Sequence, residues 1–87
     1  MVAVIAEECA VCEAMAPIVA ELATEFRGRA VIGTLDEERN RALLHQYMDF
    51  PMHPTFLFFK GGEAVDRVAG STSREDLAKR LNALIEQ

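Results

Sequence analysis

The chain has 87 residues, of which 51% are hydrophobic and 26% are charged, proportions that fit a folded globular protein and exclude a disordered tail. Nine basic and 14 acidic side chains give a net charge of −5, which argues against a nucleic-acid partner because such binding depends on neutralising phosphates. No stretch is apolar for long enough to span a membrane, and residues 1–6 lack the basic lead of a secretory signal. We therefore expect one cytoplasmic domain, residues 1–87, with no membrane partner.

The first predicted elements are a buried strand over residues 2–6 and a helix directly after it. Small and β-branched apolar residues fill the strand, as in strands covered on both faces. Apolar residues then recur at helical spacing from Val11 onward, on the face expected to turn inward. This pattern places Cys9 at the N-terminal end of the helix and Cys12 in its first turn. Pro17 is expected to bend the helix, because proline has no N–H to donate.

A second strand is predicted over residues 29–35, followed by a helix from Glu37 to about Met48 with Asp36 as its N-cap. The apolar side chains expected on the inner face of this helix are Leu43, Leu44 and Tyr47. Two prolines then exclude regular structure from residues 50–54, because each restricts its own φ and the conformation of its predecessor.

The last part of the chain predicts a hairpin and a helix. An apolar strand over 55–59 and a more polar strand over 63–69 flank a glycine turn. Thr72 and Glu75 form a capping-box pattern before the final helix. The resulting order, βαβαββα, predicts an α/β fold with a four-stranded mixed sheet and helices on both faces.

The two cysteines, separated by two residues in "ECAVCE", are the chemically distinctive feature of the chain. In a reducing compartment this spacing indicates redox or metal chemistry rather than a structural disulfide. Disulfide exchange needs a thiolate, and the N-terminus of a helix favours an anion. We expect Cys9 to attack and Cys12 to resolve the mixed disulfide. These positions lie beyond the carboxyl end of the first strand, where open α/β sheets usually carry their sites.

The chain resembles the thioredoxin family through nearly its whole length. The resemblance rests on an ordered set of features: "VAVIAEE" leading into "CAVC", Pro17 five residues later, "HPT" before an apolar strand, and "FKGGEAVDRVAG" before a final helix. It implies a minimal thioredoxin-like fold and a cis peptide before Pro54. It also implies that Pro54 lies against the cysteine pair, where it and its neighbour Thr55 would help to hold an extended substrate segment.

The function implied is that of a thiol–disulfide oxidoreductase that reduces or exchanges disulfides in a protein substrate. An unidentified reductase would recharge the pair, and we expect a monomer that needs no cofactor or metal. The chain also departs from the family. Thioredoxin itself carries a further strand and helix before the first strand, and has Trp where this chain has Glu8 and Lys where it has Glu13. Its buried Asp and Lys align here with Ala3 and Ile32.

Two residues beside the pair are predicted to tune Cys9. A carboxylate about 6 Å from a sulfur raises the thiol pKa by roughly half a unit to two units, so Glu8 should make Cys9 less acidic than a thioredoxin nucleophile. His53, directly before Pro54, carries an imidazole that titrates near neutral pH and would stabilise the thiolate if its ring faces the pair. The alternatives are that Glu8 is screened by water and that the His53 ring lies in solvent.

Two other classes of function remain open from the sequence. One is a thioredoxin-fold interaction domain with little redox activity, since a fold alone does not establish an activity. The other is a metal or iron–sulfur module in which His53, or cysteines of a second copy, completes the ligands of the pair. Zinc usually takes four ligands, and this chain offers only two cysteines and one well-placed histidine.

Overall fold

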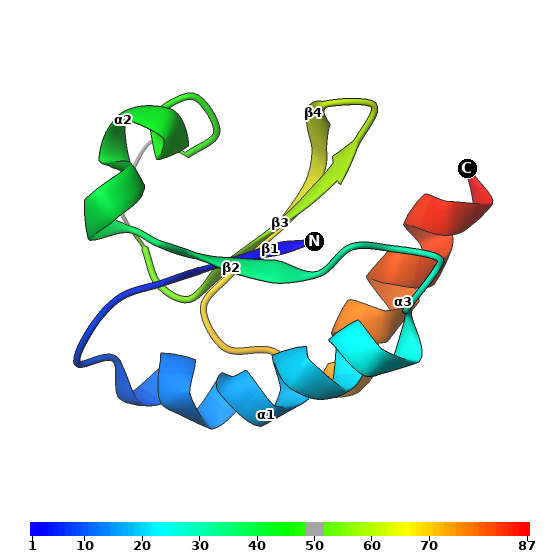
Figure 1. Ribbon diagram of the computed structural model, residues 1–87, viewed down its shortest axis with the longest axis horizontal. Helices are drawn as coiled ribbons and strands as arrows, with labels where there is room; N and C mark the ends of the chain where they lie inside the picture. The colour runs from blue at the N-terminus through cyan, green and yellow to red at the C-terminus, as the bar shows by residue number, and fades with distance from the viewer. Residues whose placement is uncertain (49–51) are drawn as a thin grey trace.

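The computed structural model describes residues 1–48 and 52–87, which form a mixed β-sheet with helices on both faces (Figure 1). The strands are β1 (Val2–Ile5), β2 (Gly33–Asp36), β3 (Thr55–Lys60) and β4 (Glu63–Ala69). The helices are α1 (Ala10–Glu25), α2 (Arg41–Leu44) and α3 (Arg74–Glu86), with a short 3₁₀ helix over Glu38–Asn40. The predicted α/β architecture is confirmed.

Strand β1 lies inside the sheet, whose order is β2-β1-β3-β4. It pairs in parallel with β2 and antiparallel with β3, so that Val4 lies opposite Leu35 on one side and Thr55 on the other. Ala3 and Val4 are both buried, because they point to opposite faces of a sheet that is covered on both. This confirms the buried strand predicted from the run of small apolar residues.

Each face of the sheet has its own apolar core. Helices α1 and α3 lie together on one face and α2 lies on the other (Figure 1). The larger core is built from residues of α1, α3, β1 and β3, with Met1 and Phe26 just outside these elements: Met1, Ala3, Met15, Val19, Leu22, Phe26, Phe56, Phe58, Leu77 and Leu81. The smaller core, on the α2 side, consists of Val4, Leu44, Met48 and Leu57.

The second strand begins later than predicted. Its first paired residue is Gly33, opposite Val2, whereas the apolar pattern suggested a start at Arg29. The amides of Arg29 and Ala30 instead donate to the carbonyl of Phe26 and close the turn that ends α1. Because these amides are already paired in the turn, they are not available to a strand.

The predicted helix over 37–48 was wrong in its length. It is broken at Asn40, whose φ of −126° and ψ of 25° depart from helical geometry and whose side-chain amide donates to the carbonyl of Asp36. Asparagine offers the backbone such alternatives to a helix. Asp36 does act at the start of the segment, since its carboxylate accepts the Arg39 N–H at 3.1 Å. Leu44 is buried as expected, but Leu43 is exposed.

The C-terminal half follows its prediction with one correction. Gly61 and Gly62 both have positive φ, as a two-residue hairpin turn between right-twisted strands requires.

The N-cap of α3 is Ser73, which accepts the Asp76 N–H at 3.0 Å. The predicted cap, Thr72, instead donates its hydroxyl to the Asp76 carboxylate. The hydrogen bond from the Thr72 hydroxyl, together with that from the Arg80 guanidinium, lowers the pKa of the Asp76 carboxyl. Residues 50 and 51 of the predicted break lie outside the described residues.

No helix in the described ranges is both long enough and apolar enough to cross a membrane. The expectations of a single domain and of a cytoplasmic location stay predictions.

Candidate active site

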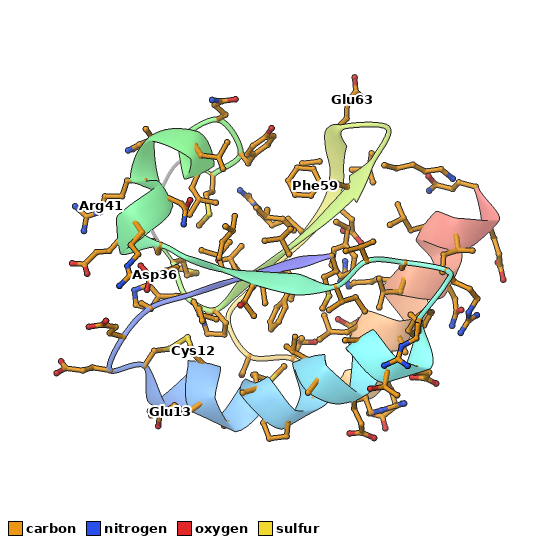
Figure 2. All side chains as sticks on the ribbon, in the orientation of Figure 1. Cys12, Glu13, Asp36, Arg41, Phe59 and Glu63 are labelled. Atoms are coloured by element: carbon orange, nitrogen blue, oxygen red, sulfur yellow. A yellow bond between two sulfur atoms is a disulfide. The ribbon has the colours of Figure 1, made fainter. Side chains whose placement is uncertain are left out.

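The cysteine pair lies where the chain leaves β1 and enters α1 (Figure 2). Cys9 is the N-cap of α1, with an extended backbone, and its sulfur accepts the Cys12 N–H at 3.1 Å. Cys12 lies in the first turn, as predicted, and the helix continues through Pro17. The sulfur of Cys9 therefore occupies the position where a side-chain acceptor satisfies an otherwise unpaired helix N–H.

The two cysteines form a disulfide, with their Cα atoms 5.2 Å apart. They differ in their exposure to solvent. Cys12 is 7% exposed and its side chain lies within the protein, whereas Cys9 is only partly buried. A reactant in solution can therefore reach the sulfur of Cys9 more easily than that of Cys12.

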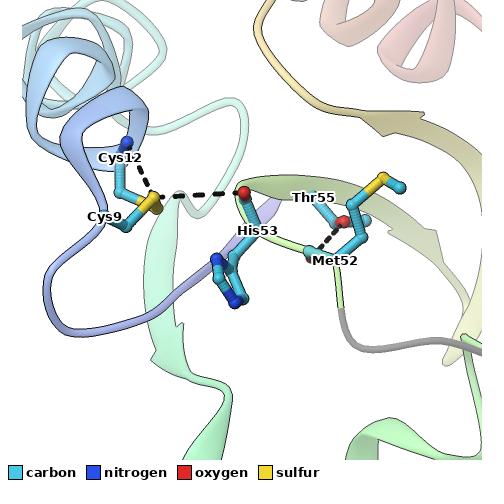
Figure 3. The surroundings of a disulfide bond; sticks show 5 residues. All are labelled: Cys9, Cys12, Met52, His53 and Thr55. Carbon is cyan, nitrogen blue, oxygen red and sulfur yellow. Dashed lines mark hydrogen bonds between the residues drawn. A yellow bond between two sulfur atoms is a disulfide. The ribbon is translucent and has the colours of Figure 1, made fainter.

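The segment before β3 lies against the pair. The His53–Pro54 peptide is cis, as the resemblance implied, and the carbonyl oxygen of His53 lies 3.9 Å from the Cys9 sulfur (Figure 3). The side chain of Pro54 is buried and lines an apolar hollow of about 310 Å³ together with Cys12 and Met15. The structure thus brings His53 and Pro54 to the cysteines, although they are more than 40 positions away in the sequence.

The imidazole of His53 also faces the pair. One of its ring nitrogens and the two cysteine sulfurs all lie within 4.8 Å of one another, while the residue as a whole is exposed. The sequence left the direction of this ring open, because a side-chain rotamer depends on the local surroundings. The ring lies beside the sulfurs rather than away from them in solvent.

Thr55 occupies a different position from the others. Its side chain is buried, and its hydroxyl donates to the Met52 carbonyl at 2.5 Å (Figure 3). The hydroxyl fastens the segment before β3 to the start of that strand. It is not exposed beside the sulfurs.

Acidic side chains flank the pair along the chain. Glu7, Glu8 and Glu13 are all exposed. Glu8 has a φ of 54°, in the left-handed region that non-glycine residues seldom adopt and that costs them roughly 1–2 kcal/mol. This backbone conformation turns the chain between the end of β1 and Cys9, and it places Glu8 directly before the cysteine pair.

Two apolar side chains near the cysteine pair are exposed to solvent. Val11, between the cysteines, is 43% exposed, although the helical period placed it on the inner face of α1. Met52, just before His53, is 50% exposed. The hydrophobic period could not identify Val11 because it does not show which residues the sheet leaves uncovered. The only signal was its position inside the cysteine motif.

The sequence of the chain is similar to known proteins that are described as thioredoxins. The family model described as Thioredoxin matches residues 1–83. Thioredoxins of the Staphylococcus aureus strains Mu50 and COL are each 36% identical to the chain over 74 residues, which cover 85% of this chain and 70% of each relative.

Proposed function

Because the chain belongs to the thioredoxin family and is a thioredoxin-like disulfide oxidoreductase, we propose that Cys9 attacks a disulfide in a protein substrate and that Cys12 resolves the product. The family and the bonded pair favour this function over an interaction domain without redox activity. The substrate class is a disulfide-containing protein, the class on which thioredoxins act.

The observation that carries the assignment of roles is the contact between the Cys12 N–H and the Cys9 sulfur, at 3.1 Å. A hydrogen bond to a charged group contributes about 1.5–3 kcal/mol, and the helix N-terminus adds about 0.3–1 kcal/mol for an anion. Both favour a thiolate on Cys9. Cys12 is buried, and it is suited to attack a sulfur already bonded to Cys9 rather than an incoming substrate.

The exchange proceeds in two steps. The Cys9 thiolate attacks one sulfur of the substrate disulfide, so a Cys9–substrate bond forms, the substrate S–S bond breaks, and the leaving thiolate takes a proton from solvent. Cys12 then loses its proton and attacks the Cys9 sulfur, which forms the Cys9–Cys12 disulfide and releases the second substrate thiolate. Over both steps the substrate gains two electrons and takes up two protons from solvent, while the pair loses two electrons and the protons of its two thiols pass to solvent. A reductase must then return the electrons.

Neighbouring residues have supporting roles in this proposal. Pro54 and the backbone of His53, which lie against the pair, hold an extended substrate segment beside Cys9. The ring of His53 tunes Cys9 from the same side. Thr55 acts indirectly, because its buried hydroxyl positions the segment that carries them. The exposed Val11 and Met52 supply apolar contacts for the substrate, and we propose that the protein acts as a monomer.

The function is tested by equilibrating the protein in dithiothreitol buffers of graded redox potential. Free thiols are trapped with a maleimide and counted by intact mass. We expect a single transition between two labels and none, as for a reversible dithiol couple, and its midpoint gives the direction of electron flow. Two labels at every potential would contradict the proposal.

Glu8→Gln should make Cys9 more reactive. A carboxylate at a separation of about 6 Å would oppose a thiolate by roughly 0.7–2.8 kcal/mol. For a Glu8 carboxylate at such a separation, alkylation of reduced Cys9 by iodoacetamide at pH 7 should be about 3- to 100-fold faster in the variant than in the wild type. The matched control is Glu86→Gln, which removes an exposed carboxylate at the far end of α3. Equal rates in the two variants would show that Glu8 is screened by water.

A further inference from the structure

We propose that the reduced cysteine pair and His53 form a three-ligand site for a thiophilic cation of the zinc class, which the protein binds only when the disulfide is open. The proposal rests on the proposed function in one respect alone, that the pair can be reduced. It does not require the protein to act on a substrate.

The three ligand atoms are already close together. The two sulfurs and one ring nitrogen of His53 lie within 4.8 Å of one another. Bonds of about 2.3 Å to sulfur and about 2.0–2.1 Å to nitrogen place tetrahedral ligands of zinc roughly 3.6–3.8 Å apart. Opening the disulfide lets the two sulfurs separate to such a distance. The spacing of the cysteines, with two residues between them, is one that zinc sites commonly use.

The three ligands come from two elements of the fold. Both cysteines come from the start of α1, and His53 comes from the segment before β3, so a cation would be held between two elements that the fold already places together. The Cys12 N–H, which points at the Cys9 sulfur, can remain bonded to that sulfur as a metal ligand, as groups behind the ligands of metal sites do. His53 is exposed and Cys9 is partly so, which leaves one side open for a fourth ligand such as water.

The local charge favours a cation. Glu7, Glu8 and Glu13 are exposed around the pair, and no lysine or arginine occurs among residues 1–26. These carboxylates disfavour the negative charge of a Cys9 thiolate, but they attract a divalent cation. Binding of Zn²⁺ also offsets the charge of the two thiolates, and the two thiol protons pass to solvent.

The cysteine pair cannot bind Zn²⁺ and form its disulfide at the same time. Reduction of the disulfide takes up two electrons and two protons, for example from dithiothreitol, and only then are two thiols available as ligands. A bound Zn²⁺ engages the same sulfur electrons that attack a substrate disulfide. The cation would therefore protect the reduced pair from oxidation and hold the oxidoreductase inactive until it is removed.

The test is a titration of the reduced protein with Zn²⁺ without oxygen, in competition with a chromophoric chelator. We expect one Zn²⁺ per chain for the reduced protein and none for the disulfide form. His53→Ala should weaken binding at least tenfold, whereas the control His45→Ala, which alters an exposed histidine at the end of α2, should leave it unchanged. Co²⁺ in place of Zn²⁺ should give sulfur-to-metal charge-transfer absorption that depends on both cysteines.

Three outcomes would overturn the site. The first is a stoichiometry of one Zn²⁺ per two chains, which would indicate cysteines shared between copies. The second is equal Zn²⁺ affinity of the wild type and His53→Ala, and the third is equal Zn²⁺ binding by the reduced and oxidised forms. Reduction of a protein disulfide is measured on the same preparations with a chelator present. If the protein reduces the disulfide in this assay but does not bind Zn²⁺, the proposed metal site is wrong and the proposed function still holds.

Discussion

Replacing Cys9 with serine is expected to slow reduction of a protein disulfide by on the order of 1,000-fold or more. A serine hydroxyl cannot form a mixed disulfide, and the remaining thiol, Cys12, is 7% exposed and cannot readily reach an incoming substrate. The measurement is the rate of reduction of insulin, with dithiothreitol as the electron source. Loss of activity should occur without loss of structure, which circular dichroism checks.

The matched variant is Cys12→Ser, which keeps the attacking thiol and lacks the resolving one. It should react with one substrate disulfide per chain and then stop, because no second thiol is available to release the product. Wild-type turnover by Cys9→Ser would contradict the assignment of Cys9 as the attacking residue.

The largest effect on stability is expected at Phe56. Its side chain is 0% exposed and belongs to the larger core between the sheet and helices α1 and α3. Replacing a buried phenylalanine with alanine costs about 3–5 kcal/mol, through lost burial and the cavity left behind. Domains are stable by only about 5–15 kcal/mol in total, so Phe56→Ala should lower the urea midpoint of unfolding sharply or leave the protein partly unfolded.

The control for this substitution is Val65→Ala in the same hairpin. Val65 is an exposed residue of β4, so its truncation should change the free energy of unfolding by less than about 1 kcal/mol. An equal loss in the two variants would show that stability does not depend on the core formed by α1, α3 and the sheet.

The elements that position the site could be predicted from the sequence because their signals are local. The run of small and β-branched apolar residues before the cysteines favours a short buried strand, and the helical period after them is continuous. A strand followed at once by a helix places Cys9 and Cys12 at the carboxyl end of that strand. The structure has this arrangement, with Cys9 as the N-cap.

The parts that could not be predicted depend on competition between local preferences or on tertiary packing. Asn40 breaks the second helix through its hydrogen bond to the backbone of Asp36, although the apolar period continues past it. Ser73 and Thr72 are both good caps, so the residue types alone do not separate them, and in the structure it is Ser73 that accepts the Asp76 N–H. The direction of the His53 ring is a rotamer set by contacts that no spacing encodes.

The central claim is that Cys9 is the sulfur that bonds to the substrate. The most direct measurement is to react reduced Cys12→Ser and Cys9→Ser with the same disulfide-containing protein, quench in acid, and map the mixed disulfides by mass spectrometry of peptides. The account predicts a substrate cysteine linked to Cys9 in the first variant and little or no adduct in the second. A stable adduct on Cys12 in Cys9→Ser, with none on Cys9 in Cys12→Ser, would contradict it.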